Sequence, residues 1–293
     1  MKLNYVNKIR GNVSISTNKK TANVLDGSYK SIYKGKSLNF EDLREYVLGD
    51  NVKDIDWKAS ARSNEILIKQ YIAERKHNIL FIMDSNKRMK ASTLKKDIKS
   101  EVSLYTAGVI AYLANSNGDY ISSITKEKEN IKYIPFKQGL YHLEYLLTSY
   151  EEVMSNDNNY SINELLDYVV KYISRRMIIF IITDIEGLES VDFHLLKMLT
   201  MKSDVLFINV NDNVMFDKDS YDLDNEQYIP NVFLNNQKLR EEELKERKSV
   251  LKRCEKELMK YNISFVDIDG YQDIHKSVIE LLERHKYAVF RSI

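Results

Sequence analysis

The amino-acid sequence predicts an α/β protein in which helices cover both faces of a mostly parallel, doubly wound sheet. Short, mostly apolar runs recur between residues 79 and 268, and such runs are typical of strands buried on both faces. Stretches with helical periodicity separate them, and this alternation favours parallel strands joined by crossover helices. We therefore expect a sheet domain over residues 77–293, preceded by a small extension with short strands over residues 1–76.

The elements of the sheet domain are expected in a regular order along the chain. A buried strand at 79–83 precedes a helix over 94–112, whose apolar residues step by three and four positions. Residues 119–136 alternate around a polar stretch, which indicates a hairpin. Pro135 places its second, antiparallel strand at a sheet edge, because proline cannot donate to the ladder. The remaining elements are a helix in the 140s and a second at 165–173, a strand at 177–182, a further helix before the strand at 205–210, a helix at 238–260, a strand at 263–268 and a helix at 273–288.

The extension carries weaker local signals. Short alternating pieces at 13–16 and 66–72 suggest small strands, and a helical turn is expected around 40–46. No stretch rich in Pro, Gly or Ser separates the extension from residue 78. We therefore expect the extension to pack on the sheet domain.

Composition excludes several classes of protein. Of the 293 residues, 43% are hydrophobic and 30% are charged, which excludes a disordered or low-complexity chain. No apolar run approaches the roughly 18 residues that cross a bilayer, and the first residues lack the apolar stretch of a signal peptide. The single cysteine, Cys254, fits a reducing compartment. We expect a cytoplasmic protein without membrane insertion.

The charges are unevenly distributed along the chain. Residues 1–76 carry 15 basic and 9 acidic side chains, whereas residues 77–293 carry 29 and 34. A basic arm can bind nucleic acid, or it can lie against an acidic body of the same chain. No run of lysine or arginine exceeds two residues, which is sparser than a typical nucleic-acid footprint. We therefore expect no nucleic-acid partner.

The sequence lacks the motifs of common enzymes. No two of the nine glycines lie closer than eight positions, which excludes the dinucleotide fingerprint and the phosphate-binding P-loop. The five histidines form neither an HExxH motif nor a metal site with paired cysteines. No G-x-S-x-G nucleophile elbow occurs either.

Two carboxylates follow strands of the predicted sheet. Asp84 comes directly after the strand at 79–83, and Asp184 comes two residues after the strand at 177–182. Ligands of doubly wound sheets bind beyond the carboxyl ends of the strands. Paired carboxylates there can hold a divalent cation; the alternative is that each aspartate only caps the helix or loop that follows.

The extension contains one recognisable motif. Residues 40–62 read FEDLREYVLGDNVKDIDWKASAR, and the marked positions are Arg44, Tyr46, Gly49, Asp50, Asp56, Trp57 and Arg62. This stretch closely resembles the signature of the domain-of-unknown-function 58 family, with Lys53 where the family usually has arginine. The resemblance covers roughly residues 25–290, because the downstream order of strands and helices agrees with the von Willebrand factor A-like domain of that family.

The resemblance implies a role in protein interaction. Members of the family are often encoded beside MoxR-type AAA+ ATPases, and the von Willebrand factor A fold generally serves adhesion and complex assembly. We therefore expect a non-enzymatic adaptor or partner of such an ATPase. The alternative is a divalent-metal-dependent hydrolase that uses Asp84 and Asp184.

The resemblance also implies where a metal would bind. The metal-ion-dependent adhesion site of this fold combines an Asp-x-Ser-x-Ser motif with a later threonine and a later aspartate. Asp84 and Asp184 match the aspartates, but Asn86 and Arg88 replace the two serines, and the loop at 138–140 offers no threonine. A guanidinium beside Asp84 would supply the positive charge that a metal otherwise brings. We expect a degenerate, partner-binding site in which Arg88 approaches Asp84 or Asp184, without Mg²⁺ or another cofactor.

The signature residues have two alternative roles. A charge network could fix the extension on the sheet domain, and its members would be Arg44, Asp50, Asp56 and Arg62, with Trp57 as a buried apolar anchor. The other role is catalytic, with Asp50 and Asp56 as an acid–base pair whose environments separate their pKa values. We favour the network.

Overall fold

The structure is a computed structural model that describes residues 3–15, 42–47, 50, 52, 55–63, 65–70, 76–213, 221–222, 227–228 and 237–291. The helices are α1 (Asn4–Ile15), α3 (Trp57–Ser63), α4 (Lys99–Ser116), α5 (Leu140–Met154), α6 (Ile162–Tyr172), α7 (Ile185–Glu189), α8 (Phe193–Thr200), α9 (Gln237–Lys260) and α10 (Ile274–Arg291), with short 3₁₀ helices η2 (Lys87–Lys90) and η3 (Tyr271–Asp273). The strands are β1 (Asp42–Glu45), β2 (Leu67–Gln70), β3 (Asn78–Met83), β4 (Tyr120–Glu127), β5 (Asn130–Lys137), β6 (Ile178–Thr183), β7 (Asp204–Val210), β8 (Tyr221–Asp222), β9 (Gln227–Tyr228) and β10 (Ser264–Ile268).

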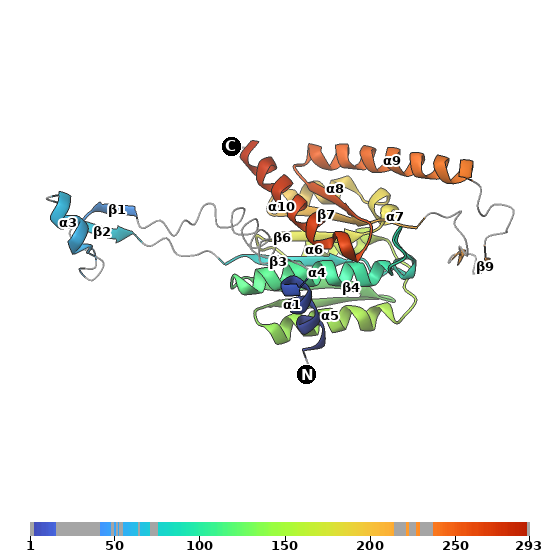
Figure 1. Cartoon of the computed structure of the whole chain (residues 1–293), viewed down its shortest axis with the longest axis horizontal. Helices are drawn as coiled ribbons and strands as arrows, with labels where there is room; N and C mark the ends of the chain where they lie inside the picture. Colours follow the sequence, from blue (N-terminus) through green and yellow to red (C-terminus); the bar gives the residue numbers. More distant parts are fainter. Residues whose placement is uncertain are drawn as a thin grey trace.

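Six strands form the central sheet, in the order β10-β7-β6-β3-β4-β5 (Figure 1). Every neighbouring pair is parallel except β4 and β5, which pair antiparallel at one edge. The predicted fold class is therefore confirmed, including the antiparallel edge strand that contains Pro135. After β3 the chain builds one half of the sheet, and after β5 it crosses to the other side of β3, which places the switch point of the strand order between β3 and β6.

Helices cover both faces of the sheet. Alternate side chains of a strand point to opposite faces, so that Ile79 and Phe81 of β3 join the apolar core beneath α1, α4, α5 and α10. Leu80 and Ile82 join the second core, which is covered by α6, α7, α8 and α9. All four side chains are fully buried, which explains the uninterrupted apolar run in the sequence. None of the helices in the described part of the chain combines the length and apolar character needed to cross a membrane.

The N-terminal helix α1 packs on the sheet domain. Its Val6 and Ile9 are buried in the core formed with α4 and α5. The buried carboxylate of Glu144 in α5 accepts hydrogen bonds from the backbone N–H groups of residues 4, 5 and 6, at 2.8–3.0 Å, and so satisfies the first turn of α1. The strand predicted at 13–16 is wrong, because the helix continues to Ile15.

Residues 42–70 form a small unit, called the signature unit below. Its strand β1 pairs antiparallel with β2, with Arg44 opposite Ile68. The strand predicted at 66–72 is confirmed by β2, whereas the helical turn predicted around 40–46 is wrong. The ladder with β2 supplies partners that lie 22 to 28 residues away along the chain, which local sequence signals do not reveal. Figure 1 shows β1, β2 and α3 apart from the six-stranded sheet.

Candidate functional site

The two predicted strand-end aspartates lie side by side at the switch point of the sheet. Asp84 follows β3 and Asp184 follows β6, and these strands are parallel neighbours in which Met83 is opposite Ile182. The backbone N–H of Asp84 donates to the carbonyl of Ile182 at 2.9 Å, which continues the ladder to the edge. Both carboxylates are buried, with 1% exposure each. Such burial requires that their charges be compensated.

Arg88 compensates both carboxylates. It belongs to η2, the short helix that follows Asp84. Its Nη2 donates to Oδ2 of Asp84 at 2.6 Å, and its Nε donates to Oδ1 of Asp184 at 2.8 Å. The predicted approach of Arg88 to these aspartates is therefore confirmed. Each aspartate also accepts a backbone N–H from the turn that follows it, so the expected capping role applies as well.

A second cation, Lys99, belongs to the same cluster. It starts α4 and is 1% exposed, and its Nζ donates to Oδ2 of Asp184 at 2.8 Å and to Asp212, which follows β7. Neither Lys99 nor Asp212 was predicted. Asp212 comes two residues after the end of a buried strand, so the rule that found Asp184 could have found it; Lys99 carries no comparable local signal. We call Asp84, Arg88, Lys99, Asp184 and Asp212 the strand-end cluster.

The charges within the strand-end cluster set its pKa values. Burial raises the pKa of Asp84 and of Asp212, because the ionised forms lose contact with water. Burial also opposes ionisation of Asp184, but Lys99 and Arg88 outweigh it and lower the pKa of that carboxyl. Burial would lower the pKa of Lys99, yet Asp184 and Asp212 outweigh it and raise that pKa. Both cations and Asp184 are therefore charged at neutral pH.

Two tyrosines and an asparagine fix the loop that carries Asp84. The hydroxyl of Tyr150 donates to the backbone carbonyl of Asp84 at 2.8 Å. The backbone N–H of Ser85 donates to the hydroxyl of Tyr160 at 2.7 Å, and the side chain of Asn158 donates to the carbonyl of Ser85 at 3.0 Å. These contacts come from α5 and the loop that follows it, so they hold the backbone at the end of β3 in one position.

The loop that faces Asp84 is not the predicted one. The sequence pointed to 138–140, but β5 runs antiparallel to β4 and ends opposite Ile121, at the beginning of that strand. Residues 138–140 therefore lie at the opposite end of the strands, where the parallel strands begin. The loop at the correct end connects α5 to α6 over residues 155–161, where Asn158 and Tyr160 contact the loop that carries Asp84. That loop also contains no threonine.

The signature unit contains one part of the predicted charge network. Arg44 donates to both carboxylate oxygens of Asp50, at 2.7 and 2.6 Å, and this contact lowers the pKa of Asp50. The backbone N–H of Val47 also donates to Asp50. The carboxylate of Asp56 accepts from the backbone N–H groups of residues 58 and 59, and so caps α3. These contacts stabilise the unit itself and do not join it to the sheet domain (Figure 1), so the prediction that the network fixes this part of the extension on the sheet is wrong.

Among the remaining signature residues, Trp57 differs from the prediction. Trp57 is 65% exposed and does not anchor the unit on the sheet domain, so its predicted burial is wrong. Tyr46 pairs through its backbone N–H with the carbonyl of Ile66, Arg62 lies exposed in the last turn of α3, and Gly49 lies outside the described residues. Trp57 is exposed because α3 buries none of its residues, and the interior of the unit is filled instead by Ile55 and Ile68.

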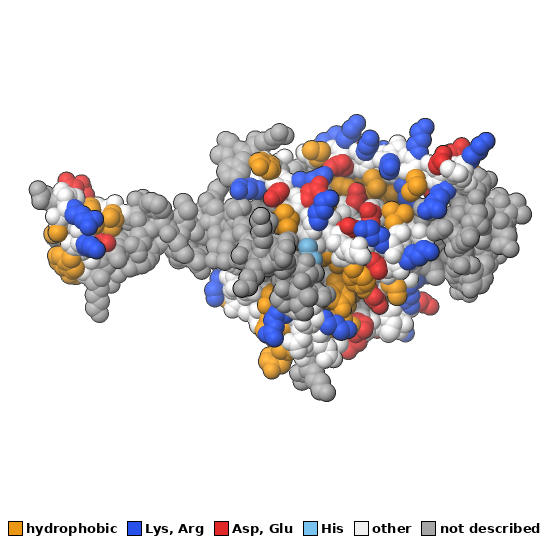
Figure 2. Space-filling view, viewed as in Figure 1, with side chains coloured by type: hydrophobic (Ala, Val, Ile, Leu, Met, Phe, Trp, Pro, Cys, Tyr) orange, Lys and Arg blue, Asp and Glu red, His pale blue; other side chains and the backbone are white. Residues whose placement is uncertain are grey.

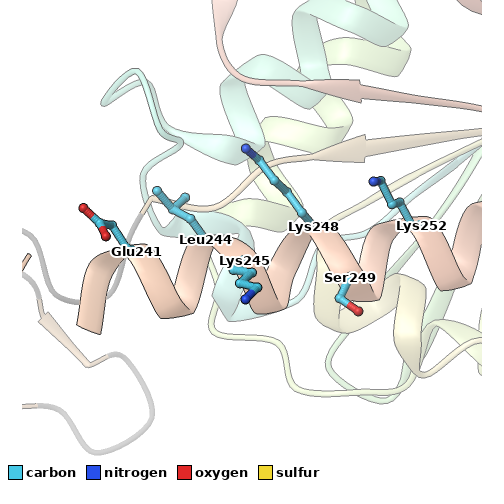
Figure 3. Close-up of a pocket in the computed structure, with 6 residues that line it drawn as sticks. All are labelled: Glu241, Leu244, Lys245, Lys248, Ser249 and Lys252. Carbon is cyan, nitrogen blue, oxygen red and sulfur yellow. The ribbon is translucent and has the colours of Figure 1, made fainter. Parts of the chain in front are cut away.

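A groove of about 520 Å³ runs along the surface of α9 (Figure 3). Its lining residues are Glu241, Leu244, Lys245, Lys248, Ser249 and Lys252. All six come from one helix and four of them are charged, so the described residues supply no opposing wall for a small molecule. We assign no ligand to this groove.

Comparison with known proteins identifies the family. A family model described as "Protein of unknown function DUF58" matches residues 42–217, more than half of the chain. YeaD of Bacillus subtilis (strain 168) is 32% identical over 117 residues, which are 40% of this chain and 27% of YeaD. Rv1480 of Mycobacterium tuberculosis is 22% identical over 130 residues, which are 44% of this chain and 41% of Rv1480. The aligned part thus spans less than half of either relative.

Solved structures with a similar arrangement are more distant in sequence. The crystal structure of BatB from Bacteroides thetaiotaomicron has a TM-score of 0.45 and 14% identity, over 71% of this chain and 98% of that one. A von Willebrand factor type A structure from Catenulispora acidiphila has a TM-score of 0.44 and 8% identity, over 73% of this chain and 43% of that one. The family match, which begins inside the signature and continues through β7, shows that the chain belongs to the DUF58 family.

Proposed function

We propose that this protein is a non-enzymatic protein-interaction module, and that it works in the cytoplasm as the partner of a MoxR-type AAA+ ATPase. One observation carries the interaction role: among its described residues, the signature unit exposes five large apolar side chains. They are Leu43, Val47, Val52, Trp57 and Ile66, with exposed fractions from 38% to 65%. Figure 2 shows apolar side chains on the surface of this unit. Apolar surface of this kind is typical of protein-binding sites.

Trp57 is the residue on which we expect binding to depend most. Tryptophan is enriched among the residues that dominate binding energy, because its large ring buries much area and its N–H can still find a partner. The ion pair between Arg44 and Asp50 stabilises the strand pair nearby, so the unit presents a preformed surface. The choice of an AAA+ ATPase as the partner rests on the family resemblance, and a cytoplasmic location follows from a partner that consumes ATP.

The strand-end cluster supports a non-enzymatic role. A general base or nucleophile needs a group that is free to react, and a catalytic metal needs open ligands. Asp84 and Asp184, the residues of the hydrolase alternative, are both held by Arg88. No contact within the cluster favours the hydrolase over the interaction module.

A binding measurement with matched variants tests the proposal. The purified MoxR-type ATPase of the same genome would be immobilised, and association of the parent protein, Trp57→Ala and Met201→Ala would be followed by biolayer interferometry. Met201 is a suitable control, since it is 77% exposed and lies in the turn between α8 and β7. This turn precedes β7, so it lies at the opposite end of the parallel strands from the strand-end cluster. We expect Trp57→Ala to weaken binding by roughly tenfold or more, and Met201→Ala to leave it unchanged.

Two results would contradict the proposal. The first is that the parent protein does not bind the ATPase at all. The second is that it hydrolyses phosphoesters with Mn²⁺ and loses this activity in Asp84→Asn, which would establish the hydrolase alternative instead.

A further inference from the structure

The metal-ion-dependent adhesion site that the fold implies needs carboxylate oxygens with free lone pairs, and most of the roughly four lone-pair sites of Asp84 are already taken. Its Oδ1 accepts the backbone N–H of Asn86 at 2.9 Å. Its Oδ2 accepts both Nη2 of Arg88 and the hydroxyl of Thr183, each at 2.6 Å. A cation could therefore bind through Oδ2 only by displacing Arg88 or Thr183.

The oxygens of Asp184 are occupied in the same way. Oδ1 accepts Nε of Arg88 at 2.8 Å and the backbone N–H of Gly187 at 3.0 Å, while Oδ2 accepts Nζ of Lys99 at 2.8 Å. Mg²⁺ and Ca²⁺ require six or more oxygen ligands, each of which must present an unshared pair. Among the described residues, no group of three or more His, Cys, Asp or Glu side chains is arranged to hold a metal.

The residues that replace the two serines of the motif are poorly suited as ligands. The side-chain oxygen of Asn86 accepts the backbone N–H of Arg88, and its amide donates to the carbonyl of Tyr160 at 3.0 Å. Arg88 itself is a donor without acceptor capacity. The residues present therefore do not fit a divalent cation.

The space between the two aspartates is filled as well. A Cβ atom placed on Gly187 of α7 would lie 2.8 Å from Nη2 of Arg88 and 3.1 Å from Oδ2 of Asp84, and closer still to Thr183. The ion-paired side chains thus pack directly against the backbone of α7. A hydrated ion could enter only if Arg88 moved out.

The cluster nevertheless has the charge that a metal would bring. Arg88 and Lys99 carry one positive charge each, and together they equal one divalent cation. They reach the site from different elements, η2 and α4, and contact carboxylates at the ends of β3, β6 and β7. Because both are part of the chain, their local concentration is fixed and dilution cannot remove them.

We propose that Arg88 and Lys99 permanently take the place of the divalent cation, so that the strand-end face of this protein is assembled without metal. The face keeps one arrangement whether or not divalent ions are present. This inference concerns the cluster alone and does not depend on the identity of the partner or on the role of the signature unit.

Metal titration of the parent protein and of a double variant tests this inference. Mn²⁺ binding would be followed by the loss of the free-ion signal in electron paramagnetic resonance, and melting temperatures would be compared in EDTA and in millimolar Mn²⁺. We expect neither binding nor a thermal shift for the parent protein. In Arg88→Ser/Lys99→Ser, three carboxylates lose their cations, and we expect Mn²⁺ to bind at least roughly tenfold more tightly than to the parent and to raise the melting temperature.

The controls separate this role from general effects of charge. Arg88→Lys keeps the charge and should stay insensitive to Mn²⁺. Lys171→Ser removes a cation from an exposed ion pair on α6 and should not create a metal site. Binding of one Mn²⁺ per parent molecule, abolished by Asp84→Asn, would overturn the proposal, as would a folded double variant that ignores Mn²⁺. If the double variant does not fold, the titration of the parent protein alone decides.

Discussion

Replacement of Lys99 by methionine is the sharpest test of the strand-end cluster. Lys99 is 1% exposed, and its ammonium donates to Asp184 and Asp212. Lys99→Met therefore leaves Asp184 paired with Arg88 alone and removes the lysine that pairs with Asp212. Removal of one partner from a buried ion pair costs about 3–5 kcal/mol, because the remaining charge stays desolvated. We expect the free energy of unfolding at pH 7 to fall by about 3 kcal/mol, the lower end of that range, since Asp212 is partly exposed.

Urea unfolding followed by far-UV circular dichroism would measure this loss. Tryptophan fluorescence is unsuitable, because the single tryptophan, Trp57, lies exposed in the signature unit and not in the sheet domain. The denaturant slope should stay unchanged while the midpoint falls. The cost arises from ionised carboxylates, so it should shrink as the pH is lowered toward about 4, the ordinary pKa of aspartate.

Two further variants calibrate the result. Lys171→Met removes an equally long cation from an exposed pair with Asp167 and should leave the urea midpoint nearly unchanged, because solvent screens exposed ion pairs. Asp212→Asn in the Lys99→Met background should recover part of the loss, because it removes a carboxylate that has become unpaired. If Lys99→Met unfolds at the same urea concentration as the parent protein, the ion pairs do not hold the strand ends together and the account of the cluster is wrong.

Two other predictions concern the extension and pH. Ile9→Ala should lower the free energy of unfolding by about 2–5 kcal/mol in urea, because Ile9 is fully buried between α1 and α4. Trp57→Ala should change it by no more than about 0.5 kcal/mol, because Trp57 is exposed. Equal effects of the two substitutions would refute the different placement of these residues. Burial raises the pKa of Asp267 to about 6, above the ordinary value, so its stabilising contribution is complete below about pH 4 and is lost as the pH rises through about 6. Between about pH 4 and pH 8, Asp267→Asn should therefore lose about 2 kcal/mol less stability than the parent protein, and parallel pH profiles would contradict this.

The candidate site was predictable only where its residues lie close together in the sequence. Asp84 and Arg88 are four positions apart, and their ion pair follows from that spacing once Asp84 is placed at the end of a strand. Lys99 contacts carboxylates 85 and 113 positions away, and nothing in its own neighbourhood indicates this. The loop at 138–140 was assigned to the wrong end of the strands, because the antiparallel strand β5 reverses the direction of the chain.

The sequence by itself determined the strands of the sheet and its antiparallel edge. Apolar runs define β3 and β6, and mostly apolar runs define β7 and β10, since a strand buried on both faces carries few polar side chains. The 40–62 motif identifies the family. Only the tertiary structure decided that a lysine from the start of α4 completes the strand-end cluster and that Trp57 faces solvent. Local patterns report whether a residue is buried and in which element, but contacts between strand ends depend on strand order, which brings distant segments together.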